Sequence, residues 1–258
     1  MTLLEINFYA HTLGGAAHVN VLLPSPEPAR LGAGAAAAYA GRAQWPVLTL
    51  LHGMQGDETS WLRHTRLEQY AREAGTAVVL PALGNSYGMD LAGGLSYFQY
   101  LSQELPAFLH ATLPLSACPS QNRIAGLSMG GFAALHLALC HPGRWAAAGS
   151  FSGALLPEKV AARARQNGAA AGSAALVPPC LLQGLAARAS GACPPLFLAC
   201  GTQDALTLSM NRQLAAALSN AGYPAAYQEW PGGHDWTFWD EALRRFLLGG
   251  TAPSDQPL

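Results

Sequence analysis

The chain has 258 residues, of which 50% are hydrophobic and 11% charged, with a net charge of −1 at pH 7. This length suits one large α/β domain with a well-buried core and is short for two. A nearly neutral chain without a basic run argues against a nucleic acid or an anionic membrane surface as partner.

The amino terminus lacks the basic and apolar segments of a secretion signal, and no run is long and apolar enough to span a bilayer. The cysteines are odd in number and form no C-x-x-C pair, which favours free thiols over a metal site. We therefore expect a cytoplasmic protein that binds no metal, with these cysteines reduced: Cys118, Cys140, Cys180, Cys193 and Cys200.

Short β-rich runs alternate with longer helical patterns, which predicts an α/β fold with a mostly parallel central sheet of about eight strands flanked by helices. A Gly14-Gly15 turn predicts that the first two strands form an antiparallel hairpin. The expected strands are residues 4–9, 18–23, 47–52, 77–80, 122–127, 146–151, 196–200 and 225–229, and the expected helices are 60–74, 97–113, 130–140, 206–221 and 236–248.

We expect residues 1–248 to form one domain, followed by a flexible tail at 249–258. Residues 24–44 are rich in Ala, Gly and Pro, which predicts a surface insertion. Residues 154–195 lie between two expected strands and form either a small cap over the site or plain crossover structure.

The pentapeptide at residues 126–130, GLSMG, fits a nucleophile elbow. An apolar run leads into it and a helical pattern follows, so Ser128 would stand on a sharp strand-to-helix turn at the carboxyl edge of the sheet. The glycines suit such a turn because the neighbouring backbone comes close. We predict Ser128 as a catalytic nucleophile.

An acid and a base follow in the order that this arrangement requires. Asp204 follows the apolar run at 195–200 and a short turn at 201–203, and the alternative for it is to cap the helix that follows. Asp235 and Asp240 fit less well, because Asp235 adjoins the candidate base and Asp240 lies within a helical pattern.

His234 is the candidate base, because two glycines precede it in a loop after the last strand. His136 lies inside the helix after Ser128 and His141 ends that helix. No two histidines have the spacing of a zinc site on a helix. The remaining histidines are expected on the surface or in packing: His11, His18, His64 and His110.

An oxyanion hole needs two backbone N–H groups that point at one position. We predict the amides of Met129 and of Met54, the latter in the loop that follows the third strand. His52 is expected to fix this loop by hydrogen bonding. Trp61 and Trp236 are candidates for the walls of a small acyl pocket, although aromatic residues are more often core.

The chain resembles the putative-esterase family of α/β-hydrolases, which includes tributyrin esterases, S-formylglutathione hydrolase (esterase D) and feruloyl or acetyl-xylan esterases. The bacterial tributyrin esterases are the most similar type. At the oxyanion loop the chain has HGMQG, whereas S-formylglutathione hydrolases usually carry S-G-x-x-C. The matching segments are residues 19–24, 51–54 with Trp61, 125–132, 151–153, 201–204 and 233–236.

The resemblance implies a Ser128–His234–Asp204 triad, an oxyanion hole of the Met54 and Met129 amides, small acyl esters as substrates and no cofactor. We expect a serine carboxylesterase for short acyl chains; self-association into a homo-oligomer is compatible with the fold. The alternatives are a thioesterase for S-formylglutathione, an acetyl-xylan or feruloyl-type esterase, and a non-catalytic protein that uses the cleft for binding.

Overall fold

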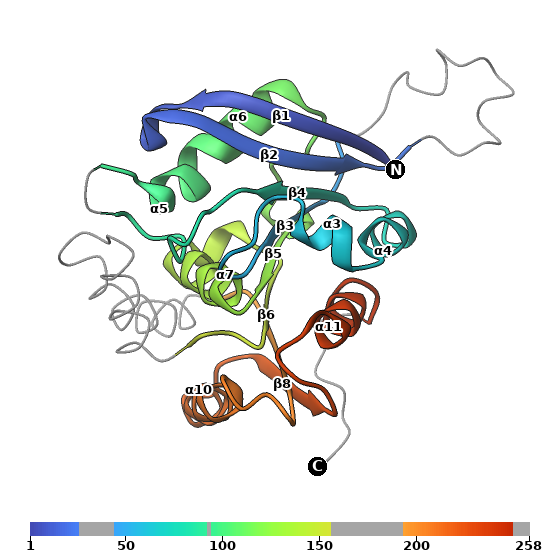
Figure 1. The fold of residues 1–258 in the computed structure, drawn as a ribbon, viewed down its shortest axis with the longest axis vertical. Helices are drawn as coiled ribbons and strands as arrows, with labels where there is room; N and C mark the ends of the chain where they lie inside the picture. Colours follow the sequence, from blue (N-terminus) through green and yellow to red (C-terminus); the bar gives the residue numbers. More distant parts are fainter. Residues whose placement is uncertain (26–43, 92–93, 156–192, 250–258) are drawn as a thin grey trace, which may run out of the picture.

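The computed structural model describes residues 1–25, 44–91, 94–155 and 193–249 (Figure 1). In these segments eight strands form one sheet in the order β1-β2-β4-β3-β5-β6-β7-β8. The strands are β1 Thr2–Ala10, β2 Gly15–Leu23, β3 Val47–Leu51, β4 Ala77–Pro81, β5 Asn122–Leu127, β6 Ala147–Phe151, β7 Leu196–Gly201 and β8 Ala225–Trp230.

Strand β2 pairs antiparallel with both β1 and β4, and every other neighbouring pair is parallel. The predicted α/β fold with an antiparallel amino-terminal hairpin is thus confirmed. The hairpin turns through a short 3₁₀ helix, His11–Leu13, and Gly14 takes a left-handed φ of 59°. Glycine fits this position because the left-handed region costs it nothing.

Helices cover both faces of the sheet in the described part of the chain. Figure 1 shows α3, α4 and α11 on one face, and α6 and α7 on the other. Each face buries its own apolar cluster. The helices are α3 Ser60–His64, α4 Leu67–Glu73, α5 Tyr97–Gln99, the π-helical turn η2 Tyr100–Glu104, α6 Leu105–Thr112, α7 Met129–Cys140, α10 Leu208–Asn220 and α11 Trp236–Leu248.

The helix predicted over 60–74 is interrupted, because Thr65 is extended and separates α3 from α4. The Thr65 hydroxyl donates to the carbonyl of Trp61 at 2.6 Å. The Arg66 backbone N–H donates to Asp240 on α11 at 2.9 Å, and its guanidinium binds the same carboxylate. Side-chain hydrogen bonds therefore replace those of a continuous helix at this point.

The helix predicted over 97–113 forms, but it widens into the π-helical turn η2. Pro106 explains the irregularity, because it has no N–H for the carbonyl four residues earlier, that of Ser102. The Arg144 guanidinium donates to that carbonyl. Glu104, at the end of η2, accepts hydrogen bonds from the backbone of His11 and Thr12 and so attaches the hairpin turn to this helix.

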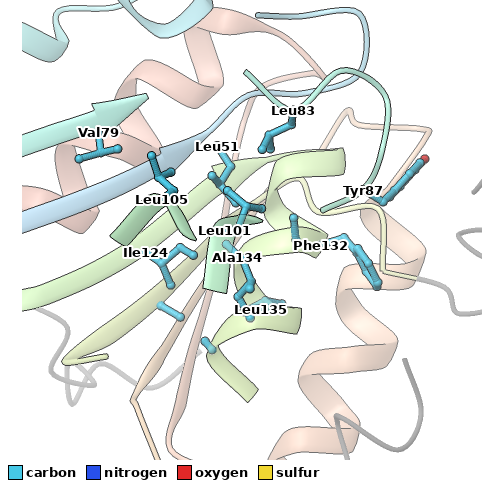
Figure 2. Close-up of a cluster of buried hydrophobic side chains, with 14 of the residues drawn as sticks. Leu51, Val79, Leu83, Tyr87, Leu101, Leu105, Ile124, Phe132, Ala134 and Leu135 are labelled. Atoms are coloured by element: carbon cyan, nitrogen blue, oxygen red, sulfur yellow. The ribbon is translucent and has the colours of Figure 1, made fainter. Parts of the chain in front are cut away.

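Helix α7 lies in the centre of the molecule, and all its residues from Met129 to Leu139 are buried. Figure 2 shows its side chains Phe132 and Leu135 in the apolar layer that also contains Leu51 and Ile124 of the sheet. A helix that is buried all round belongs to the core of a protein. The helix that starts at the candidate nucleophile is therefore firmly held.

Parts of the expected insertion at 24–44, the expected cap at 154–195 and the expected tail at 249–258 lie outside the described residues. Among described cysteines, Cys118 and Cys200 are free thiols. Cys140 is disulfide-bonded, which corrects the expectation that all cysteines are reduced. A search of the described helices finds none with the length and apolar character needed to cross a membrane.

His136 of α7 is an unusual core residue, with only 5% of its surface exposed. Its ring lies between those of Phe98 and Phe132, at 5.1 and 5.5 Å. Neither ring nitrogen has a hydrogen-bond partner among the described residues. Burial, with a further contribution from nearby His141, lowers the pKa of His136 to about 4.

This lowered pKa predicts an acid-sensitive fold. Because the unfolded chain takes up the proton first, His136 contributes stability above its unfolded pKa of about 6.5 and loses it as pH falls toward about 4. In His136→Phe we expect the unfolding free energy to fall less between pH 7.5 and 5.0 than in the parent, by roughly 2 kcal/mol. Urea titrations measure this, and exposed His110→Gln should behave like the parent.

Candidate active site

Ser128 lies between β5 and α7 in a conformation that non-glycine residues rarely adopt, with φ 49° and ψ −114°. Strain of this kind persists only where the surroundings enforce it. The Ser128 N–H donates to the carbonyl of Phe151 at 2.9 Å, and the Ser128 carbonyl accepts from Phe132 and Ala154. Hydrogen bonds therefore hold both the N–H and the carbonyl of Ser128. The predicted strand–turn–helix context is present.

The glycines around Ser128 are required by close backbone contact. A Cβ on Gly126 would lie 2.5 Å from the carbonyl carbon and oxygen of Gly130. A Cβ on Gly130 would lie 2.5 Å from the carbonyl oxygens of Leu51 and His52. Because backbone atoms cannot rotate away, only glycine permits the start of α7 to pack on the end of β3.

The structure brings Ser128, His234 and Asp204 together, although they lie far apart in sequence. His234 Nε2 is 3.1 Å from Ser128 Oγ, and His234 Nδ1 is 2.8 Å from Asp204 Oδ2. An imidazole that donates from Nδ1 to the carboxylate leaves Nε2 free to accept the serine proton. The three side chains have the geometry of a nucleophile, a general base and an orienting acid.

Asp204 is fully buried, and each of its oxygens is satisfied. Oδ1 accepts from the backbone N–H groups of Leu206 and Thr207, at 3.0 and 2.9 Å. Oδ2 accepts from the Thr207 hydroxyl at 2.6 Å as well as from His234. Asp204 therefore does not cap α10, whose N-cap residue is Thr207. Its Oδ1 holds the turn before that helix, and its Oδ2 binds His234.

This environment keeps Asp204 ionised. Burial alone would raise the pKa of the carboxyl, but the hydrogen bonds from His234 and Thr207 outweigh it and hold the pKa well below its usual range. Thr207 was not among the predicted site residues. The signal that could have indicated it is its position three residues after the acid, from which its hydroxyl and N–H can both reach the carboxylate.

The two alternative acids have other partners. Asp235 caps helix α11 by accepting from the N–H of Phe238 at 3.0 Å. Asp240 binds Arg66 and the hydroxyl of Tyr70, the latter at 2.9 Å. Neither carboxylate is hydrogen-bonded to the ring of His234, so the geometry favours Asp204 as its partner.

His52 fixes the loop that carries Met54. Its Nε2 accepts from the N–H of Leu83 at 2.9 Å, and its Nδ1 lies 2.7 Å from the carbonyl of Gly53. Burial lowers the pKa of His52 and so favours the neutral ring. A neutral imidazole has one nitrogen that accepts and one that donates, as these two contacts require. The predicted positioning role of His52 agrees with this geometry.

The loop held by His52 lies directly beside the nucleophile. A Cβ placed on Gly53 would be 3.7 Å from Cβ of Ser128, and both Met54 and Ser128 line one cavity of about 310 Å³. Met129 is the first residue of α7, where backbone N–H groups have no partner within the helix. The two predicted oxyanion amides therefore belong to segments that meet at Ser128.

The predicted tryptophans differ in their position. Trp236 lines the cavity, whereas Trp61 is not among its lining residues and is 1% exposed. The Trp61 indole N–H donates to the carbonyl of Leu51, and its ring packs edge-on against Trp236 at 5.4 Å. Trp61 thus supports the cavity wall from behind.

Sequence reasoning did not find three other residues of this cavity. Trp239, a buried residue of α11, also lines it and packs edge-on against His234 at 5.0 Å. Arg63 and His64 also line it, and His64 stacks on Trp236 at 4.6 Å. These two residues end α3, just before the break at Thr65 that the sequence did not predict.

With this geometry in place, comparison with known proteins identifies the family. The sequence profile of the family described as "Putative esterase" matches residues 10–249. The chain belongs to this family. It is therefore an esterase of the serine hydrolase class with an α/β-hydrolase fold.

Individual members of this esterase family resemble the chain over nearly its whole length. An acetyl esterase of Caldicellulosiruptor saccharolyticus is 28% identical, over 94% of this chain and 96% of its own. The solved structure of a fluorophosphonate-binding serine hydrolase F of Staphylococcus aureus has a TM-score of 0.83 at 28% identity, covering 97% of this chain and 98% of its own. An S-formylglutathione hydrolase of Staphylococcus aureus has a TM-score of 0.77 at 27% identity, covering 97% and 99%.

The packing at Gly130 gives a direct test of the elbow. We expect Gly130→Ala to lower the unfolding free energy by about 3 kcal/mol or more, because its Cβ meets rigid backbone. Gly143→Ala is the matched control, since nothing lies within 4 Å of a Cβ there, and should change stability by less than about 0.5 kcal/mol. Urea denaturation compares the two; equal stabilities would contradict the assigned contact.

Proposed function

We propose that this esterase hydrolyses short-chain carboxylic esters, with Ser128 as nucleophile, His234 as general base and Asp204 as orienting acid. The observation that carries the proposal is the continuous hydrogen-bonded path from Ser128 Oγ through both nitrogens of His234 to the buried Asp204 carboxylate. Among the described histidines, only His234 is hydrogen-bonded to both a serine hydroxyl and a carboxylate.

In the first half of the reaction, Ser128 Oγ attacks the ester carbonyl as its proton passes to His234 Nε2. The ionised Asp204 holds the ring and stabilises the imidazolium that forms. The amides of Met54 and Met129 stabilise the tetrahedral oxyanion. The protonated His234 then donates to the leaving alcohol, and the acyl group remains on Ser128.

In the second half, His234 takes a proton from water as that water attacks the acyl-enzyme. The tetrahedral intermediate then collapses, His234 returns the proton to Ser128 Oγ, and a carboxylic acid is released. These steps need only side chains, backbone amides and water, so we propose that the enzyme uses no cofactor. A cavity of about 310 Å³ with walls of Trp236 and Trp239 suits small esters. The similarity to an acetyl esterase supports a short acyl group.

Replacement of the nucleophile tests the proposal. We expect Ser128→Ala to lose hydrolysis of p-nitrophenyl acetate by roughly 10⁴-fold, because the acyl-enzyme can no longer form. Labelling by a fluorophosphonate probe should disappear as well. Exposed Ser120→Ala is the control and should keep both. Parent-like turnover by Ser128→Ala, with circular dichroism unchanged, would refute the assignment.

A thioesterase acting on S-formylglutathione is the second candidate. Two observations favour it, the similarity to a solved S-formylglutathione hydrolase and the guanidinium of Arg63 in the cavity wall. Arg63 is 58% exposed, and its ion pair with Asp57 is long at 3.4 Å. Such a cation could receive a carboxylate of the thiol part of the substrate.

A substrate series separates the candidates. We expect kcat/KM to be highest for p-nitrophenyl acetate or butyrate and to fall at longer chains, since the cavity limits the acyl group. A higher kcat/KM for S-formylglutathione that drops about tenfold in Arg63→Gln would favour the thioesterase. A preference for feruloyl or acetylated xylan esters would instead indicate the polysaccharide-directed alternative. Arg63→Gln should still react with the fluorophosphonate probe, because Ser128 is intact.

A further inference from the structure

A second cavity lies at the amino-terminal end of strand β5, opposite the end at which Ser128 lies. Its volume is about 190 Å³, and Asn122, the first residue of β5, lines it. Ser128 follows the last residue of the same strand, and a strand of this length spans roughly 20 Å. The cavity is therefore separate from the candidate active site.

The walls of this second cavity are mainly aliphatic. Leu101 of η2, with Leu105 and Leu109 of α6, faces strand residues that include Val79. Figure 2 shows Leu101, Leu105 and Val79 in the same apolar layer. The cavity also borders exposed residues, among them His110 and Pro119, so it opens to solvent.

The polar groups of the cavity include two basic side chains, Arg144 and His110, and no acidic side chain. Arg144 is partly buried and makes no ion pair with any described residue. Among the described residues, its guanidinium donates to the carbonyl of Ser102 alone. A guanidinium has five N–H donors and stays charged, so most of its donors remain for an anion.

A further donor in the cavity wall lacks a partner. The indole Nε1 of Trp145 is buried and has no acceptor among the described residues. Trp145 directly follows Arg144, so both donors come from the connection between α7 and β6. This nitrogen has almost no accessible surface, so a ligand head in the cavity has Arg144 and not Trp145 as its partner.

The sequence explains why the Arg144 guanidinium lies here. Pro106 leaves the Ser102 carbonyl without its helical donor, and Arg144 supplies the hydrogen bond. This contact fixes the guanidinium at the rim of the cavity formed by the widened turn η2. π-helical turns occur frequently at functional sites.

We propose that this cavity binds a short-chain aliphatic carboxylate, with its head on Arg144 and its tail between Leu101, Leu105 and Leu109. An apolar cavity of about 150 Å³ can hold benzene, with its six carbons, so about 190 Å³ accepts roughly eight non-hydrogen atoms. Hexanoate has this size. The inference does not depend on the proposed catalytic function, although such acids are the products that the proposed reaction would release.

Isothermal titration calorimetry with sodium hexanoate tests this site. We expect saturable binding to the parent protein with a Kd of about 1 mM or tighter. Arg144→Gln, whose amide can still donate to Ser102, should weaken binding about tenfold because the charged contact is lost. Neutral 1-hexanol should bind the parent about tenfold more weakly than hexanoate for the same reason.

Two further variants distinguish this cavity from the catalytic one. Arg63→Gln, in the wall of the catalytic cavity, should leave hexanoate affinity unchanged. Leu109→Phe should abolish binding by filling the second cavity, and circular dichroism checks that the variant is folded. The proposal is overturned if no saturable binding occurs in this range, if Arg144→Gln binds like the parent, or if Arg63→Gln loses the affinity.

Discussion

The close contact of the start of α7 with the end of β3 is the constraint on which the site depends. Gly126 and Gly130 let two backbones meet at distances that no side chain permits. The contact forces Ser128 into a left-handed φ and places it beside the loop after β3. This one contact brings the candidate nucleophile and the candidate oxyanion segments together, without a contribution from His234 or Asp204.

Hydrogen bonds position the other residues of the site. Some of these bonds hold the surrounding backbone, and others join one site residue to the next. Asp204 gives one oxygen to the backbone before α10 and the other to His234 and Thr207. His52 uses both ring nitrogens to hold the loop, which leaves it no free nitrogen for a proton transfer. Hydrogen bonds therefore hold both Asp204 and His52 in place.

Local patterns were sufficient to predict the strands, the hairpin and the spacing of the candidate triad, because apolar periodicity and turn residues act over short distances. These patterns failed where a contact with a side chain distant in sequence determines the backbone conformation. The break at Thr65 depends on Asp240 of α11, and the widened turn before Pro106 is completed by Arg144. The same limit applies to the position of Trp61 behind the cavity wall, because its ring packs against Trp236, which is distant in sequence.

The fold separates its two cavities by the length of β5. The strand pairs along its length with β3 and β6, and its residues Ile124 to Leu127 are buried. This strand therefore keeps the two cavities roughly 20 Å apart. A carboxylate bound at Arg144 would stabilise the folded state by mass action, because it would bind the folded chain and not the unfolded one.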